Sequence, residues 1–253
     1  MSKLWLPRRH AAEILGVDRR TFIAAGLAAG AGGLMTLAGC NSEGPKSARG
    51  VLAAAERWNE RVERALFRHN AMNTAPARAG AAGERFPSYF IADQVPEWDE
   101  AARGVWRLEV GGLVRRPLRL TLDELKALPR TELRLEHFCV EGWSAVALRT
   151  GVRLRDLARL AEVDPNAGYV DFQSFDDDYH ESWDIESALH AQTLIVYGQD
   201  GRLLGPAYGA PARVYSPVKL GYKCTKYLTR ILFLPHRNGG YWSDKGYEWY
   251  AGV

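Results

Sequence analysis

The sequence predicts an α+β domain with mixed β-sheets and peripheral helices, and three observations favour it. Short apolar segments with strand character outnumber the helical segments, the two kinds do not alternate regularly, and no internal repeat runs through the 253 residues. A doubly wound parallel sheet needs a helical crossover between successive strands, so it fits this order less well. The part of the chain beyond residue 40 is long enough for one large domain with its own core.

The first 40 residues have the pattern of an export signal. Asp18-Arg19-Arg20-Thr21-Phe22-Ile23 joins paired arginines to an aromatic and an aliphatic residue, and an uncharged run rich in Ala and Gly follows up to Gly39. The run ends in Leu37-Ala38-Gly39-Cys40, the pattern of a bacterial lipoprotein cleavage site. We predict a twin-arginine lipoprotein signal over residues 1–40 with Cys40 lipidated. The alternative is an N-terminal anchor helix with a chance Arg-Arg pair.

The charge of the chain is concentrated in this leader. The whole sequence carries 33 basic and 30 acidic residues. Five of the basic and two of the acidic residues lie within the first 40, so the remainder holds 28 of each and has no net charge. Nucleic-acid binding, which needs a basic footprint, therefore has no support.

The segment 41–85 is predicted to be a tether followed by one amphipathic helix. Residues 41–50 are polar, and from Val51 to about Asn70 apolar residues recur at helical spacing. They are Leu52, Ala55, Trp58, Val62, Ala65 and Leu66. An Ala/Gly/Pro loop follows. The main domain is predicted to span residues 86–253 and to begin with an extended segment, because Pro87 and Pro96 disfavour a helix there.

The first half of that domain contains a strand, a turn and a short helix. Val105–Val110 reads as a strand and Gly111-Gly112 as the turn after it. Thr121-x-x-Glu124 is a capping box that predicts a helix ending near Pro129. The alternation of Leu133 and Leu135 then predicts the strand that leads to Cys139.

The second half is predicted to contain one helix and mostly strands. The helix spans Val152–Val163, and the strands and turns follow in order up to a tail rich in aromatic residues over 239–250. The strands are 169–175, 194–197, 213–215 and 227–234, with turns at 176–178 and 198–201. The three aspartates at 176–178 are most simply a solvated turn, since a metal site would need a further ligand that is not evident.

The stretch His137-Phe138-Cys139-Val140-Glu141-Gly142-Trp143-Ser144 carries the first chemical signal. His137 and Cys139 are two residues apart on an extended backbone, so both side chains point to one face. A soft thiolate beside an imidazole suits metal ligation or nucleophilic attack, whereas the structural alternative is a buried small hydrophobe and a hydrogen-bonded neighbour. Beyond Cys40 only Cys139 and Cys224 remain, and in an exported protein a disulfide between them stays open.

A basic loop carries the second signal. Gly209-Ala210-Pro211-Ala212-Arg213 leads into Ser216–Lys226, a segment with three lysines broken by Gly and Pro. Such a loop can direct backbone N–H groups and cationic side chains at one anionic group such as a phosphate. The alternative is a solvated surface segment.

Together the two stretches resemble the molybdopterin-dependent oxidoreductases of the sulfite oxidase family, and within it the bacterial branch of periplasmic protein-methionine-sulfoxide reductase catalytic subunits. Cys-Val-Glu-Gly-Trp-Ser at Cys139 is similar to that branch's molybdenum-cysteine loop. Gly-Ala-Pro-x-Arg followed by Pro-x-Lys-x-Gly-x-Lys-x-x-Lys is similar to its pterin-phosphate loop. The similarity covers roughly 86–253. It implies a sulfite-oxidase-type molybdopterin-binding domain, and twin-arginine export suits a protein that loads its cofactor before crossing a membrane.

The resemblance implies a role for individual residues. Cys139 would be the thiolate ligand of molybdenum. The remaining cofactor-binding positions would be Tyr89, Phe90, Ser174, Tyr208, Arg213, Cys224, Thr225 and Lys226. Tyr208 falls where the reductase branch has Asn and the sulfite oxidases have His. His137 and Trp143, with the tail residues Tyr241, Trp242 and Tyr247, are candidates to wall the substrate pocket.

Two departures argue against sulfite as the substrate. The sulfite oxidases carry an Arg just after the extended Phe segment, where this sequence has Ile91, Ala92 and Asp93. The 253 residues also leave no room for the C-terminal dimerisation domain of those enzymes. The expectation is two-electron oxygen-atom transfer on a sulfoxide, N-oxide or related small polar substrate.

The resemblance also implies partners and a location. Electrons would pass to or from an external one-electron carrier, since the sequence has no haem or iron–sulfur motif. The resemblance suggests a membrane haem subunit for this role. The chain would lie on the periplasmic side of the bacterial cell membrane, anchored by lipid at Cys40. Two alternatives stay open. One is an exported hydrolase with Cys139 as nucleophile and His137 or His180 as base. The other is a non-catalytic, lipid-anchored binding protein with the same fold.

Overall fold

The computed structural model describes residues 49–67, 72, 86–89, 92–176 and 178–253. The chain divides into two compact units, Met1–Arg61 and Val62–Val253. The predicted signal over 1–40, with Cys40, lies outside the described residues, as does Phe90. Among the described residues no helix combines the length and the apolar character needed to span a bilayer.

Helix α2 (Arg49–Leu66) confirms the amphipathic helix predicted near the N-terminus. It crosses the division between the two units. Its apolar side chains share one face, on which Val51 and Trp58 are 73% and 67% exposed.

The first sheet of the second unit is mixed, as predicted. Its strand order is β2-β1-β10-β5-β6, and only the β1–β10 pair is parallel. The strands are β1 (Arg107–Gly112), β2 (Leu118–Thr121), β5 (Tyr169–Ser174), β6 (His180–Asp184) and β10 (Leu228–Leu234). Leu108, Phe172 and Ile231 are fully buried in the core beneath it.

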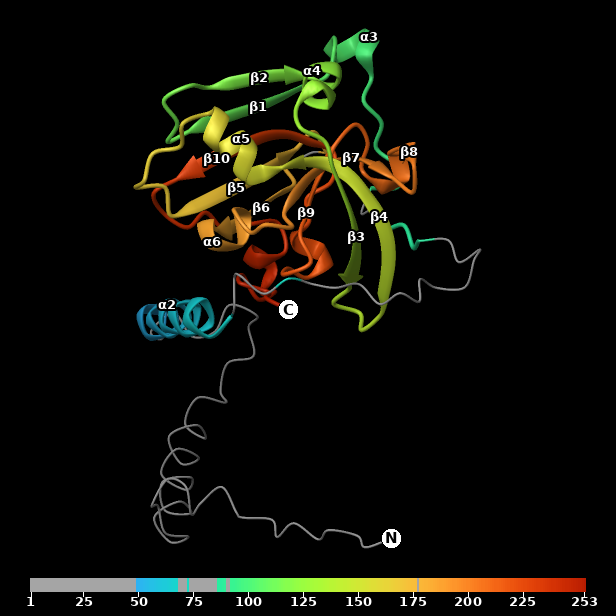
Figure 1. Ribbon diagram of the computed structural model, residues 1–253. Helices are drawn as coiled ribbons and strands as arrows, with labels where there is room; N and C mark the ends of the chain where they lie inside the picture. The colour runs from blue at the N-terminus through green and yellow to red at the C-terminus, as the bar shows by residue number, and fades with distance from the viewer. Residues whose placement is uncertain (1–48, 68–71, 73–85, 90–91, 177) are drawn as a thin grey trace, which may run out of the picture. The chain divides into compact units, whose positions relative to one another are not determined.

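The second sheet is antiparallel and carries the Cys139 stretch. Its order is β3-β4-β7-β8, and β9 also pairs with β7. Figure 1 shows β3 and β4 as a long hairpin whose turn points toward the same end of the unit as the red C-terminal segment. The strands are β3 (Thr131–Phe138), β4 (Ser144–Arg153), β7 (Leu194–Gln199), β8 (Arg202–Leu203) and β9 (Arg213–Tyr215).

The helices of this unit are short and connect the strands. The capping box at the start of α4 is present, with the Glu124 amide donating to Thr121 Oγ1 at 3.2 Å and the Thr121 amide donating to Glu124 Oε2 at 2.7 Å. The helices are α3 (Glu100–Arg103), α4 (Leu122–Ala127), α5 (Leu154–Leu160), α6 (Ile185–Ala188), and the 3₁₀ turns η3 (Pro206–Tyr208), η4 (Gly221–Lys223) and η5 (Ser243–Lys245).

Several boundaries predicted from the sequence are wrong. The turn predicted at 198–201 is shorter, because β7 continues through Gly198 and Gln199, and the helix predicted to end at Val163 ends at Leu160. Two further differences have a common cause. Gly111 and Gly112 are not a turn, because the parallel pairing of β1 continues through them to Leu232 and Phe233 of β10. The helix predicted from Val152 begins two residues later, because Val152 and Arg153 remain paired with β7 at the end of β4. In both places a tertiary strand partner overrides the local pattern.

Candidate functional site

The turn of the β3–β4 hairpin presents Cys139 at the edge of a cavity. The Cys139 amide donates to the Trp143 carbonyl at 2.9 Å and the Gly142 amide donates to the Cys139 carbonyl at 3.1 Å, so backbone bonds hold the turn closed. Cys139 and Cys224 are both free thiols, which excludes the disulfide left open above. Burial is the main factor that raises the pKa of the Cys139 thiol.

His137 lies on the same side of the hairpin as Cys139, as its spacing predicts, and is buried. Its ring stacks on Tyr215 with 5.8 Å between ring centres and lies 5.6 Å from that of Trp143. Burial lowers the pKa of His137 to about 3, and the positive charges of Arg213, Arg149 and Lys226 contribute. The imidazole is therefore neutral near pH 7.

Aromatic side chains from distant segments form the walls of the cavity. Trp143 is fixed by its Nε1–H, which donates to Glu141 Oε2 at 3.0 Å. The Tyr208 hydroxyl donates to the Phe86 carbonyl at 2.9 Å. In the C-terminal tail, the rings of Trp242 and Tyr247 lie 4.9 Å apart. The cavity has a volume of about 180 Å³, which suits a ligand much larger than water.

Two cations face this cavity from other elements. Arg213 on β9 donates from Nη2 to the Cys224 carbonyl at 2.9 Å, while its Nε has no partner in the part of the chain that the structure describes. Lys226 Nζ donates to the Ala207 carbonyl at 2.9 Å and to the Tyr89 carbonyl. Beside them, the buried Thr225 hydroxyl has no hydrogen-bond partner among the described residues. Within the described part of the chain, neither cation is paired with a carboxylate.

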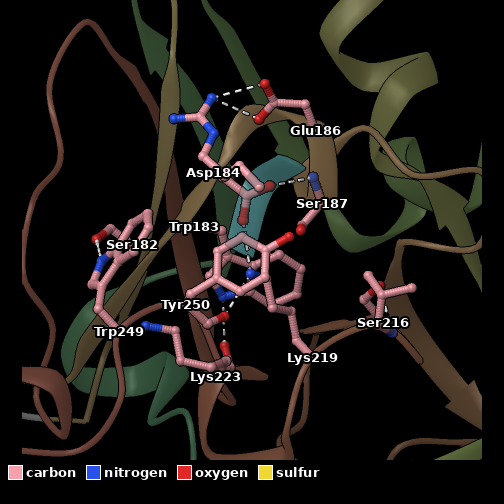
Figure 2. A network of polar contacts seen from close by, with 12 residues as sticks. Ser182, Trp183, Asp184, Glu186, Ser187, Ser216, Lys219, Lys223, Trp249 and Tyr250 are labelled. Carbon is pink, nitrogen blue, oxygen red and sulfur yellow. Dashed lines mark hydrogen bonds and ion pairs between the residues drawn. The ribbon is translucent and has the colours of Figure 1, made fainter. Parts of the chain in front are cut away.

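The other two lysines of the basic loop are not available for a phosphate. Lys219 Nζ lies 2.7 Å from Asp184 Oδ1, and Figure 2 shows both residues. Lys223 Nζ lies 2.6 Å from Glu181 Oε2, and all four side chains are fully buried. Neither of these lysines lines the cavity, and neither was among the predicted cofactor-binding residues. The two lysines instead attach the loop to β6.

Most of the predicted site residues meet in this one cavity. Its lining includes Tyr89, His137, Cys139, Trp143, Tyr208, Arg213, Cys224, Lys226, Trp242 and Tyr247. Ser174 does not line the cavity, and its hydroxyl accepts a hydrogen bond from the Asp176 amide at 2.9 Å. Thr225 lies between two lining residues, and Tyr241 packs edge-on against Trp242 at 5.3 Å between ring centres.

The structure places further residues at or beside the cavity that were not predicted as site residues, and four of them matter for the site. Phe86 and Asp176 line it, Glu141 fixes Trp143, and Arg149 on β4 is fully buried behind Phe86. The guanidinium carbon of Arg149 lies 4.4 Å from the centre of the Phe86 ring. A lone Arg in an apolar strand gives no local signal, because the same pattern fits a solvent-facing strand residue.

The hydrolase alternative lacks the necessary contacts. No hydrogen bond joins His137 to Cys139, although both residues are described. His180 is paired through Nδ1 with Asp171 Oδ1 at 2.8 Å and does not line the cavity. Asp171 is the first cause of the raised pKa of His180. An imidazole of pKa about 3 is also a poor general base for a thiol.

The residues present fit an anionic, thiol-ligated group. Buried cations without a carboxylate partner and a buried hydroxyl without a hydrogen bond are unfavourable unless a ligand satisfies them. Arg213 and Lys226 line the same cavity as the Cys139 thiol, and Thr225 lies between the lining residues Cys224 and Lys226. Among the described residues, no cluster of His, Cys, Asp and Glu could hold a metal ion alone. A metal at Cys139 would therefore need ligands from a cofactor.

The free charge of Lys226 predicts a pH dependence of stability. Burial, with repulsion from Arg213 and Arg149, lowers the pKa of Lys226 to about 7. The unfolded chain binds that proton up to about pH 10.4, so the unfolded state holds more protons between these values. The melting temperature of the cofactor-free chain should therefore rise from pH 7 to pH 10. The melting temperature of the Lys226→Met variant should rise less over the same range. A parallel rise in both proteins would contradict this assignment.

Gly221 is the second testable position, because η4 passes against His137. A Cβ added at Gly221 would lie 2.4 Å from His137 Nε2. The ring cannot retreat without displacing Tyr215 and Trp143. We expect Gly221→Ala to lower the free energy of unfolding by about 1–3 kcal/mol, measured by urea denaturation. The control is Gly205→Ala, where the nearest atom would be 4.0 Å away; equal losses in both variants would contradict the close approach.

Comparison with known proteins gives consistent matches. Residues 93–242 match the family described as oxidoreductase molybdopterin binding domain. The putative protein-methionine-sulfoxide reductase subunit YedZ1 of Azospira oryzae is 40% identical over 224 residues, which cover 87% of this chain and 83% of that protein. The protein-methionine-sulfoxide reductase catalytic subunit MsrP of Gluconobacter oxydans is 33% identical over 168 residues, and the match spans 54% of its length.

A solved structure matches the fold. The sulfane dehydrogenase SoxCD from Paracoccus pantotrophus aligns with a TM-score of 0.52 and 22% identity, over 56% of this chain and 40% of that chain. At this identity the similarity concerns the fold alone. It agrees with the two-sheet α+β architecture described above.

Proposed function

The chain belongs to the oxidoreductase molybdopterin binding domain family, and on that premise we propose that it catalyses two-electron reduction of a sulfoxide, with methionine sulfoxide as the first candidate. It is a molybdopterin-dependent oxidoreductase of the sulfite oxidase family, and its cofactor is molybdenum-molybdopterin. The proposal of substrate is supported by the sulfoxide reductases among its relatives. The main observation in support of the site is that the Cys139 thiol lines the same cavity as two cations that no described carboxylate pairs with.

Each group of residues has a distinct role in this proposal. Cys139 holds the molybdenum, while Arg213, Thr225 and Lys226 bind the pterin phosphate. Tyr89, Tyr208 and Cys224, which line the same cavity, would complete the contacts to the pterin. When bound, the cofactor supplies oxygen-atom transfer with water as the source or sink of oxygen.

The wall near Cys139 favours a neutral substrate. Trp143, Trp242 and Tyr247 present aromatic surface there, and neutral His137 adds no charge. In this assignment the cations Arg213 and Lys226 are engaged by the cofactor phosphate. A sulfoxide, which is polar but uncharged, suits such a pocket better than the sulfite dianion.

We further propose that the protein acts outside the cytoplasm. The twin-arginine pattern and the Cys40 lipobox support export and anchoring on the periplasmic side of the cell membrane. Electrons come from an external one-electron carrier, for which a membrane haem subunit is the candidate. The anchor is tested by comparing how much protein is released from globomycin-treated and untreated cells, together with lipid analysis at Cys40.

The function is tested on protein exported with its leader intact from a host that makes the cofactor. The purified protein should contain about one molybdenum per chain and should reduce methionine sulfoxide with a dye donor. N-oxides and sulfite serve as comparison substrates. Molybdenum-loaded protein that oxidises sulfite but leaves every sulfoxide unchanged would exclude the proposed reaction, and protein without molybdenum would exclude the proposed site.

A further inference from the structure

Glu181 on β6 holds the C-terminal tail against the domain. Its Oε1 accepts the Trp242 amide at 2.8 Å, and its Oε2 accepts the Ser243 hydroxyl at 3.1 Å. Gly240 bridges to Glu181 in the backbone, and a Cβ at Gly240 would lie 2.3 Å from Oε2. A fully buried carboxylate therefore fixes the point at which the tail turns toward the cavity.

The same carboxylate holds the segment that contains the cofactor-binding residues. Lys223 Nζ lies 2.6 Å from Glu181 Oε2 and donates to the Ser243 hydroxyl at 3.1 Å. The Lys223 carbonyl accepts Trp183 Nε1–H at 2.9 Å. Lys223 directly precedes Cys224 and Thr225, so the ion pair fixes the backbone where that segment begins.

The two segments that Glu181 joins both line the cavity. Trp242 and Tyr247 line it from the tail, and Tyr222 and Cys224 line it from the loop. The ring of Tyr247 in the tail contacts Tyr222 of the loop, with 5.4 Å between ring centres, and lies 4.9 Å from the ring of Trp242. The Glu181 contacts therefore link the placement of Trp242 to that of the segment that contains Cys224.

We infer that Glu181 and Lys223 are positioning residues that set the Trp242 wall against the cofactor-binding segment, and so determine the fit of the substrate. The inference rests on the proposed function for its substrate but not for its geometry. Neither residue lines the cavity, so both act through the groups that they hold.

A second buried ion pair in the same loop provides a matched control. Lys219 Nζ contacts Asp184 Oδ1 at 2.7 Å and the Tyr250 carbonyl at 2.6 Å, and both side chains are fully buried (Figure 2). Asp184 also accepts the Ser187 amide at 2.7 Å. None of these partners lines the cavity. Breaking this pair should affect stability without moving the Trp242 wall.

The kinetic test compares Glu181→Leu/Lys223→Met with Lys219→Met in cofactor-loaded protein. Replacing both members of the first pair avoids an unpaired buried charge, while it removes the acceptor of the Trp242 amide. We expect the double variant to raise KM for methionine sulfoxide at least tenfold with a smaller change in kcat. Lys219→Met should keep KM within twofold of the wild type, even where its melting temperature falls. Equal KM values in the double variant and the wild type would overturn the inference.

A second measurement reports position without substrate. Tryptophan is replaced by 5-fluorotryptophan, and the ¹⁹F resonance of Trp242 is assigned by its loss in Trp242→Phe. The resonance should shift in the double variant and in the milder Glu181→Gln, but not in Lys219→Met. An unmoved resonance in Glu181→Gln would overturn the inference. If the wild type fails to reduce sulfoxides, the proposed function fails while this measurement still tests the positioning.

Discussion

Cys139→Ser is expected to abolish molybdenum binding and activity while the fold is retained. A serine hydroxyl is a hard ligand that stays protonated near pH 7, whereas a soft thiolate suits a thiophilic metal. The turn itself depends on backbone bonds between Cys139, Gly142 and Trp143, which serine leaves intact. Metal analysis of exported protein should give less than about a tenth of the wild-type molybdenum, because one ligand bond of a metal typically contributes several kcal/mol.

Thermal unfolding of the cofactor-free proteins provides the control for this variant. Cys139 is only partly buried, so the change to serine should alter the free energy of unfolding by no more than about 0.5 kcal/mol. A Cys139→Ser protein that folds and keeps its molybdenum would contradict the assignment of the ligand. Under the hydrolase alternative, neither protein would contain the metal and the variant would lose esterase or amidase activity.

Local patterns predicted the elements that depend on neighbours in the sequence. The capping box at Thr121 and the alternation before His137 both arise within one helix or one strand, and the structure confirms them. Strand β6 was not predicted, because Glu181, Ser182 and Asp184 read as a polar segment. They are buried only because tail and loop residues supply their partners.

The same limit applies to the site. Sequence reasoning placed Cys139, Arg213 and Lys226 together, since their motifs are short and ordered. It could not separate the free lysine from the paired ones, because Glu181 and Asp184 lie 42 and 35 residues away from Lys223 and Lys219. Polar partners at such distances have no periodic signature, so the role of a cation in the loop depends on the tertiary fold.

Arg149→Met is expected to stabilise the cofactor-free chain and to weaken retention of the cofactor. The Arg149 side chain is fully buried, and no described residue forms a hydrogen bond with its Nε or Nη2. Burial, with repulsion from Arg213, lowers the pKa of Arg149 to about 10, so the group remains charged near pH 7. Its favourable contacts are a hydrogen bond to Gln199 and the rings of Phe86 and Tyr215, at 4.4 and 4.7 Å.

The balance of these terms sets the size of the first effect. Replacing buried charged groups by apolar residues of similar volume is neutral or stabilising by about 1–4 kcal/mol. The lost contacts with two rings offset about 1–2 kcal/mol of that gain. We therefore expect the free energy of unfolding of the cofactor-free chain to rise by about 1–2 kcal/mol in urea denaturation. Arg230→Met, which removes an exposed Arg paired with Glu109, is the control and should change it by less than about 0.5 kcal/mol.

The second effect has the opposite sign, because the cofactor is an anion. Arg149 adds to the positive potential at Arg213 and Lys226, and its charge contributes to the lowered pKa of Lys226. Without it, loaded protein should lose its pterin about tenfold faster during dialysis, which corresponds to about 1.4 kcal/mol of binding free energy. A variant that is less stable without cofactor and retains pterin normally would show that Arg149 serves packing. Opposite shifts in the two measurements would identify a buried charge that costs stability in the empty domain and is offset by the bound anion.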